Sequence, residues 1–308
     1  MTGSEIPVIV NARAGTAAAT GISADDLREL FGRAKMHAEV LEAKNGSELA
    51  QFARAAVARK PRMIVAGGGD GTINAVAAHV AGTGIPLGVL PLGTLNHFAR
   101  DLGMPSDIEA AVRALAMGHT VPVDVGEVNG RVFLNNSSIG LYPSLVDHRD
   151  REQQRLGLGK WSALLRATLT VLHRYPLLSV RVRCGDQQFV RRTPLVFVGN
   201  NAYAMEGLDI GRRERIDAGT LSLYIPRRQG RFALFRIAFR ALFGRLRAVD
   251  DFDSMQAPEI SIETRRHHVR VATDGEVASV ATPLHYSIRV GALRVIVPTA
   301  PDGPAREP

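Results

Sequence analysis

Residues 65–74 read V-A-G-G-G-D-G-T-I-N, and this stretch decides how the first part of the chain is interpreted. An apolar run, Met63–Ala66, precedes the glycines, and a segment with helical spacing, Thr72–Ala81, follows them. Glycine backbones approach a ligand closely, and a turn that opens a helix presents N–H groups to an anion. Four glycines therefore predict a phosphate-binding loop: Gly67, Gly68, Gly69 and Gly71.

Asp70 stands among these glycines, where a bare carboxylate would repel a phosphate. Two functions would explain it, since a carboxylate can hold Mg²⁺ or take a proton from an attacking hydroxyl. The alternative is a tight turn in which Asp70 is only a helix N-cap.

Two further stretches favour the functional interpretation. Pro91–Gly103 reads P-L-G-T-L-N-H-F-A-R-D-L-G and also follows a predicted strand, Leu87–Leu90. Gly93 and Thr94 in it offer a backbone N–H and a hydroxyl. Loops at the carboxyl ends of parallel strands face one crevice, so both loops are expected to share a ligand. The other stretch is T-D-G-E at 273–276, where two carboxylates flank a glycine in a predicted hairpin turn.

Strands and helices alternate over residues 1–122, which predicts a doubly wound α/β domain. The expected strands are Ile6–Val10, Met63–Ala66 and Leu87–Leu90, and the expected helices are Ala24–Lys35, Gly46–Arg59, Thr72–Ala81 and Ser106–Met117. Ser106 with Glu109 three residues later predicts a capping box at the last of these helices.

Residues 123–298 are rich in β-branched residues and turn signals, which predicts a second, mainly antiparallel, β-sandwich-like domain. Its expected strands are Val180–Cys184, Phe189–Val198, Leu221–Ile225, Glu259–Glu263, Val269–Ala272, Leu284–Val290 and Leu293–Val297. Helical spacing interrupts them at Trp161–His173 and Arg231–Leu246, and the proline-rich residues 299–308 are expected to form a loose tail.

Composition narrows the class of protein further. The 308 residues carry a formal net charge of +8, which suits nucleic acid, anionic lipid or phosphorylated ligands. No nucleic-acid-binding motif is found and aromatic residues make up only 6%, so no nucleic-acid partner is expected. The single cysteine, Cys184, excludes an intramolecular disulfide. No signal peptide or membrane span is recognised, and a cytoplasmic location is expected.

Together the motifs resemble the diacylglycerol kinase catalytic-domain family of lipid kinases. Val8–Gly15 resembles its opening strand and turn, Gly68–Asn74 its G-G-D-G-T-x-N loop, and Asp274–Glu276 its late D-G-E. Pro91–Gly103 is similar to P-L-G-T-x-N-D-F-A-R-x-L-G, the most specific of these motifs. The G-G-D-G-T loop is shared with NAD kinases, so NAD kinase-like chemistry stays an alternative, as does a catalytically silent lipid or nucleotide binder.

The resemblance implies an ATP- and Mg²⁺-dependent transfer of the γ-phosphoryl group to a lipid hydroxyl. It places Asn11, Gly15, Gly68, Gly69, Asp70, Gly71, Thr72, Asn74 and Thr94 around ATP. Lys160 falls where relatives place a phosphate-contacting cation. The catalytic carboxylates it implies are Glu276, Asp274 and Asp70, and which of them is the base stays open.

Two departures from the family pattern affect the expected site. His97 replaces the aspartate of N-D-F, and the acidic D-G-x-L stretch that carries a structural metal in some members reads D-A-G-T-L here. A metal at Asp217 is therefore only a weak expectation.

An amphipathic stretch with arginine flanks, 231–247, suits either an interfacial helix on anionic lipid or a helix packed on the sheet. We expect peripheral association with a membrane surface. The lipid acceptor and the oligomeric state are not encoded in these motifs.

Overall fold

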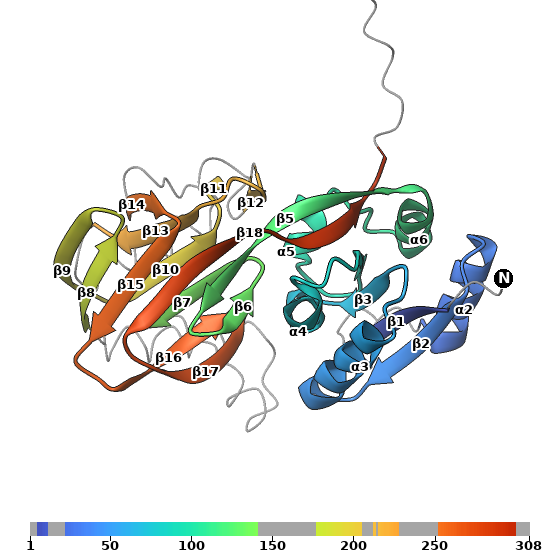
Figure 1. The fold of residues 1–308 in the computed structure, drawn as a ribbon, viewed down its shortest axis with the longest axis horizontal. Helices are drawn as coiled ribbons and strands as arrows, with labels where there is room; N and C mark the ends of the chain where they lie inside the picture. Colours follow the sequence, from blue (N-terminus) through green and yellow to red (C-terminus); the bar gives the residue numbers. More distant parts are fainter. Residues whose placement is uncertain are drawn as a thin grey trace, which may run out of the picture. The chain divides into compact units, whose positions relative to one another are not determined.

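The computed structural model describes residues 5–11, 22–140, 177–204, 212–213, 215–227 and 252–299 (Figure 1). The chain forms two compact units. The first consists of Met1–Val123 with Gly291–Pro308, and the second of Asp124–Val290.

The first unit is built on a parallel sheet. Its strands are β1 (Ile6–Asn11), β2 (Ala38–Ala43), β3 (Ile64–Gly68) and β4 (Leu87–Pro91), in the order β2-β1-β3-β4. The central strands are apolar and buried throughout, as expected for a parallel sheet covered on both faces. Val295, near the end of β18 (Leu284–Val297), pairs in parallel with Leu87.

Helices cover both faces of this sheet. They are α2 (Ala24–Arg33), α3 (Gly46–Ala58), α4 (Asp70–Val80), α5 (His97–Asp101) and α6 (Ile108–Met117). Helix α3 packs beside α4, whereas α2 packs beside α6. The strand–helix alternation therefore gives the doubly wound arrangement that the sequence predicts.

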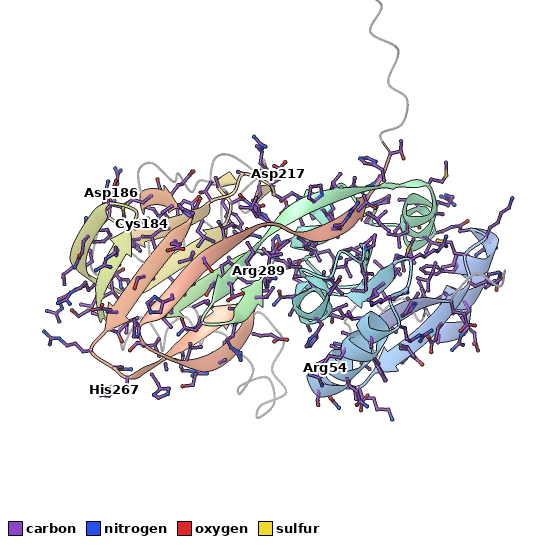
Figure 2. The ribbon with its side chains drawn as sticks, in the orientation of Figure 1. Arg54, Cys184, Asp186, Asp217, His267 and Arg289 are labelled. Atoms are coloured by element: carbon purple, nitrogen blue, oxygen red, sulfur yellow. The ribbon has the colours of Figure 1, made fainter. Side chains whose placement is uncertain are left out.

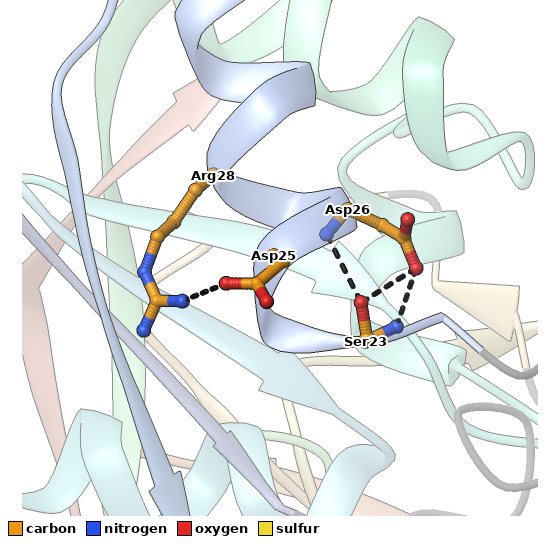
Figure 3. Close-up of polar contacts among 4 residues, drawn as sticks. All are labelled: Ser23, Asp25, Asp26 and Arg28. Atoms are coloured by element: carbon orange, nitrogen blue, oxygen red, sulfur yellow. Dashed lines mark hydrogen bonds and ion pairs between the residues drawn. The ribbon is translucent and has the colours of Figure 1, made fainter.

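Local capping fixes where these helices begin. At α2 the Ser23 hydroxyl accepts from the Asp26 N–H at 3.1 Å, and the Asp26 carboxylate accepts from the Ser23 N–H at 2.8 Å (Figure 3). Asp25 and Arg28 form an ion pair on the same turn. The prediction at α6 was wrong in detail, because Asp107 and not Ser106 is the N-cap and accepts from the Ala110 N–H.

The second unit is a β-sandwich. One layer is a six-stranded antiparallel sheet in the order β14-β13-β10-β7-β16-β17. Its strands are β7 (Asn136–Gly140), β10 (Leu195–Asn200), β13 (Leu221–Pro226), β14 (Phe252–Ala257), β16 (His268–Thr273) and β17 (Glu276–Ala281). The other layer has the order β18-β15-β8-β9. Its further strands are β15 (Glu259–Thr264), β8 (Leu178–Cys184) and β9 (Gln187–Thr193). Shorter elements are β6 (Arg131–Phe133), β11 (Tyr203–Ala204) and β12 (Arg212–Arg213), and β5 (His119–Val128) runs from the first unit into the second.

Apolar side chains from both layers form the core of this unit. Ile139 and Val271 of the six-stranded sheet pack in one cluster with Val182, Ile262 and Leu284 of the other. The fold class predicted from the sequence, an α/β domain followed by an antiparallel β-sandwich, is confirmed.

Three sequence-based boundaries differ from the structure. The predicted strand Phe189–Val198 is two strands, because Pro194 lacks the N–H that would continue the ladder. The predicted strands Leu284–Val290 and Leu293–Val297 form one strand, β18, in which Gly291 adopts a φ of 59°. The first compact unit includes the residues from Gly291 onward, whereas the sequence expectation kept residues 291–298 in the second domain. The predicted helices at Trp161–His173 and Arg231–Leu246 lie outside the described residues.

Candidate active site

The first candidate loop connects β3 to α4. Gly69 is the N-cap of α4 and, as a glycine, supplies no side-chain cap. The backbone N–H groups of its first turn therefore receive no side-chain acceptor at the cap, and the positive end of the helix dipole lies beside them. This is the arrangement that binds anions at helix N-termini.

The second loop, which follows β4, lies against the first. The Leu92 N–H donates to the Gly68 carbonyl at 3.2 Å, which joins the two loops through the backbone. A Cβ added to Gly93 would lie 2.3 Å from the Cα of Gly69. Only glycine fits this approach, so the structure brings the two predicted phosphate loops together.

Asp70 ties the loops through its side chain. Its two carboxylate oxygens accept from the backbone N–H groups of His97 at 3.1 Å and Phe98 at 3.0 Å. These N–H groups open α5, whose own N-cap, Asn96, makes no side-chain cap bond. Asp70 thus caps a helix 27 residues away rather than its own, which neither sequence interpretation foresaw.

Asn96 shapes the second loop, and the sequence interpretation gave it no role. Its Oδ1 accepts from the Gly93 N–H at 2.9 Å, and its Nδ2 donates to the Gly93 carbonyl at 2.8 Å. Its backbone is left-handed, with φ of 50°, a conformation that asparagine tolerates better than most residues. The next residues toward the loop tip, Thr94 and Leu95, are exposed.

The residues predicted around ATP differ in their burial: some lie beneath the first loop, and others lie at its surface. Thr72 and Asn74 are buried on α4, and the Asn11 Nδ2 donates to the Thr72 Oγ1 at 3.3 Å. Because Thr72 and Asn74 are buried, they suit a structural role that supports the loop. Gly69 and Gly93, in contrast, are partly exposed. Gly15 and Lys160 lie outside the described residues.

The D-G-E motif forms the hairpin turn between β16 and β17. Asp274 and Gly275 adopt φ of 48° and 88°, and Thr273 pairs with Glu276 across the turn. Positive φ at both central residues is the signature of the tight turns that match strand twist. The predicted turn is therefore confirmed, and it presents Glu276 at the first position of β17.

The Asp274 carboxylate is buried and fastens the turn to the start of β7. It accepts backbone N–H groups from Leu134 at 2.7 Å, and from Asn135 and Asn136 at 2.9 Å each. Burial raises its pKa to about 6, while these three hydrogen bonds and the nearby Arg213 guanidinium act in the opposite direction. Its surroundings are those of an anchor, which is not the role that the family motif assigned to it.

Arg213 is the buried cation of this region, and sequence reasoning missed it. Its guanidinium donates to the Leu134 carbonyl at 2.6 Å, the Asn200 carbonyl at 3.2 Å and the Asn135 Oδ1 at 3.0 Å. Only 4% of its surface is exposed. A buried guanidinium with these acceptors holds residues 134–135 in place beside Asp274.

Glu276 differs from Asp274 in its surroundings. The residue is exposed, yet the surrounding protein raises the pKa of its carboxyl, and Arg131 acts against that shift. A carboxyl with a raised pKa is a better proton acceptor, so Glu276 suits general-base chemistry better than the anchored Asp274.

The Asp217 side chain is bonded to a neighbouring arginine. Its Oδ1 accepts from the Arg215 Nε at 3.0 Å, and this hydrogen bond lowers the pKa of the Asp217 carboxyl. Gly219 donates its N–H to the Asp124 Oδ2 at 2.7 Å. Within the described residues, no group of three or more His, Cys, Asp or Glu side chains is placed to hold a metal. A metal at Asp217 stays a prediction.

Comparisons with known proteins identify the family. The family model described as "Diacylglycerol kinase catalytic domain" matches residues 5–128. The model described as "YegS C-terminal NAD kinase beta sandwich-like domain" matches residues 148–297. A Pseudomonas aeruginosa PAO1 relative named "Probable lipid kinase YegS-like" is 34% identical over 239 residues, which cover 76% of each chain. The chain belongs to the diacylglycerol kinase catalytic-domain family.

Other relatives of this family match shorter stretches. A Klebsiella pneumoniae relative with the same name is 33% identical over 164 residues, which span 53% of this chain and 55% of that protein. "Diacylglycerol kinase" of Staphylococcus epidermidis is 29% identical over 185 residues, which span 56% of this chain and 58% of that protein.

A solved structure supports the fold over nearly the whole chain. It is a crystal structure "of a putative diacylglycerol kinase" from Bacillus anthracis str. Sterne, with a TM-score of 0.75 and 27% identity over 97% of both chains. Among the helices that the structure describes in this kinase-family chain, none is both long and apolar enough to cross a membrane.

Proposed function

We propose that this family member is a lipid kinase that transfers the γ-phosphoryl group of ATP to the hydroxyl of a diacylglycerol-type lipid, with Mg²⁺. The observation that carries the proposal is the apposition of the two glycine loops at the uncapped start of α4. Backbone amides from these loops suit the phosphates of a nucleotide, and phosphoryl transfer depends mainly on positioning and charge stabilisation. The printed names of the relatives support the same chemistry.

The residues of the first loop fit a phosphate ligand. Gly69 and Gly93 leave the loop surface without side chains, so a phosphate can approach the backbone N–H groups at the start of α4 directly. The Gly93 N–H, which the sequence offered as a phosphate donor, donates instead to the Asn96 Oδ1. Asp70 and Asn96 keep the two loops in register through hydrogen bonds to backbone groups. ATP would therefore meet a preorganised set of donors.

The donor set also fits Mg²⁺. This ion is usually held by one or two carboxylates together with substrate phosphates, rather than by a cage of protein ligands. Asp70 is the carboxylate that the loops provide, and Mg²⁺ bound there would neutralise phosphate charge.

Glu276 is the residue that we propose as general base for the lipid hydroxyl. Its exposure gives access to an acceptor, and partial burial raises the pKa of its carboxyl, which makes it a better proton acceptor. Asp274 would act as a positioning residue, because its three backbone hydrogen bonds fix the turn that carries Glu276.

The proposal is tested by a γ-phosphoryl transfer assay with radiolabelled ATP and Mg²⁺. Acceptors are diacylglycerol, phosphatidylglycerol and a sphingoid base, each in mixed vesicles, with NAD as a separate soluble acceptor. Label in a lipid, and its loss with Glu276→Gln, is the expected result. Label in NAD alone would replace the proposal with NAD kinase-like chemistry, and ATP binding without transfer to any acceptor would point to a silent binder.

A further inference from the structure

A pocket lined by three arginines lies in the second unit, away from the D-G-E turn in sequence. It measures about 350 Å³ and is formed by the start of β8, the end of β9 and the residues that follow β15. Arg192 pairs with Ser179 across β8 and β9, and Arg265 and Arg266 follow directly on the last residue of β15. Figure 2 labels His267, which lies on the loop that connects β15 in one layer to β16 in the other.

Hydrogen bonds hold the backbone of this loop between β15 and β16. The Arg266 carbonyl accepts from the Thr282 hydroxyl at 2.6 Å and from the Thr264 hydroxyl at 3.0 Å. The Thr282 N–H donates in turn to the His267 carbonyl at 2.9 Å. The arginine side chains therefore project from a fixed turn, which lowers the entropic cost of organising them around a ligand.

The charge of the pocket is not compensated within it. No carboxylate lines it, and among the described residues the side chains of Arg192, Arg265 and Arg266 form no ion pair. Nearby arginines behave differently, since Arg181 pairs with Glu263 at 3.2 Å and Arg191 with Asp253 at 3.0 Å. Guanidinium groups gathered without a carboxylate, together with the Ser179 hydroxyl, are the donors that phosphate groups take.

Apolar side chains surround these cations and favour a lipid over a free phosphate. Leu177 is 37% exposed and lines the pocket together with Leu178. A smaller pocket of about 150 Å³ shares both leucines and Arg266. Val190, on the same face of β9 as Arg192, is 63% exposed. Apolar groups beside cations are the composition of surfaces that bind anionic membranes.

We infer that the pocket of Arg192, Arg265 and Arg266 binds the phosphate-bearing headgroup of an anionic phospholipid and holds this face of the second unit on a membrane. The inference deepens the proposed function, because a kinase acting on a bilayer lipid needs a contact that keeps it at the surface. The contact is separate from the residues assigned to ATP and to the base. Binding of the protein to vesicles can be measured without phosphoryl transfer.

Flotation of the full chain with vesicles tests the inference. The vesicles contain phosphatidylcholine with phosphatidylglycerol, or phosphatidylcholine alone. Replacing Arg192, Arg265 and Arg266 with glutamine should weaken binding to the anionic vesicles about fivefold for each arginine and about a hundredfold for all three. Binding to phosphatidylcholine alone should be weak for both proteins.

A matched control removes the same net charge elsewhere. The control triple variant replaces Arg33, Arg59 and Arg113, each of which pairs with a glutamate in the first unit, by glutamine. It should retain most of the binding to anionic vesicles. An equal loss in both triple variants would overturn the inference, because general net charge and not the pocket would then drive association.

Further arms separate the remaining outcomes. Unchanged binding in the pocket variant overturns the inference, as does full displacement of the protein from vesicles by glycerol 3-phosphate at low concentration, which would mark a soluble phosphate ligand. If the triple variant fails to fold, Arg265→Gln and Arg266→Gln at the exposed turn replace it, each with the fivefold expectation. With acceptor lipid in detergent micelles, pocket variants should keep their transfer rate. Absence of transfer in the unmodified protein would refute the proposed function while leaving the vesicle result to decide the pocket.

Discussion

The substitution Asp274→Asn has an effect on stability that depends on pH. Asp274 is fully buried, and its pKa is raised to about 6 in the folded protein. In the unfolded chain an aspartate titrates near 3.9. The folded protein therefore binds the proton more tightly, so protonation of Asp274 stabilises the fold below the unfolded pKa, and this contribution is lost as pH rises through about 6.

The size of the effect follows from the two pKa values. A difference of about two units corresponds to roughly 3 kcal/mol of unfolding free energy, of which about 2 kcal/mol appears between pH 7 and pH 4.5. Asparagine does not titrate, so the variant lacks this gain on acidification. At neutral pH the substitution has opposing effects. It removes a buried charge, but it leaves either the Leu134 N–H or both the Asn135 and Asn136 N–H groups facing an amide nitrogen.

Urea unfolding at the two pH values measures the difference directly. The unmodified protein should gain about 2 kcal/mol more than Asp274→Asn when pH falls from 7 to 4.5. Asp217→Asn is the control, because the hydrogen bond from Arg215 lowers the pKa of Asp217 below its ordinary value of 3.8, so its contribution to stability changes little between pH 7 and 4.5. Identical pH dependence of the unmodified protein and Asp274→Asn would refute the reasoning, since the buried carboxyl would then titrate as in the unfolded chain.

Three further substitutions test the candidate site. Glu276→Gln should lower the transfer rate by at least about a hundredfold while ATP binding measured by calorimetry is retained, as expected for loss of a general base. Gly93→Ala places a Cβ 2.3 Å from the Gly69 Cα and should weaken ATP binding, with a loss of about 1–3 kcal/mol in urea unfolding. Asp70→Asn leaves either the His97 or the Phe98 N–H without its acceptor, which should cost about 1–3 kcal/mol and speed hydrogen exchange at that amide.

Two neutral substitutions serve as controls for transfer and for ATP binding. Asp186→Asn removes a carboxylate from the exposed turn between β8 and β9 and should leave transfer unchanged (Figure 2). Gly32→Ala in α2 adds a Cβ that meets nothing within 4 Å and should leave ATP binding intact. Near-normal transfer in Glu276→Gln would remove Glu276 from the mechanism. Normal ATP binding in Gly93→Ala would show that the close approach of Gly93 to Gly69 does not affect the nucleotide. Unchanged hydrogen exchange in Asp70→Asn would mean that the start of α5 does not depend on the Asp70 carboxylate.

The sequence by itself determined the class of fold. Periodicity and glycine placement predicted β1, β3, β4 and the helices around them, because these signals act through neighbouring residues. The two-residue turn at Asp274 and Gly275 was readable for the same reason. Boundaries that depend on a single backbone group, such as the break at Pro194, were less well placed.

Only the tertiary structure decided what the carboxylates contact. Asp70 bonds to backbone N–H groups 27 and 28 residues away, and Asp274 to groups 138 to 140 residues away. Arg213 and the arginine pocket likewise gain their meaning from chain segments that are distant in sequence. A local pattern specifies the conformation of its own backbone, but the partner of a buried polar group is set by packing of the whole unit, where each desolvated donor must find an acceptor.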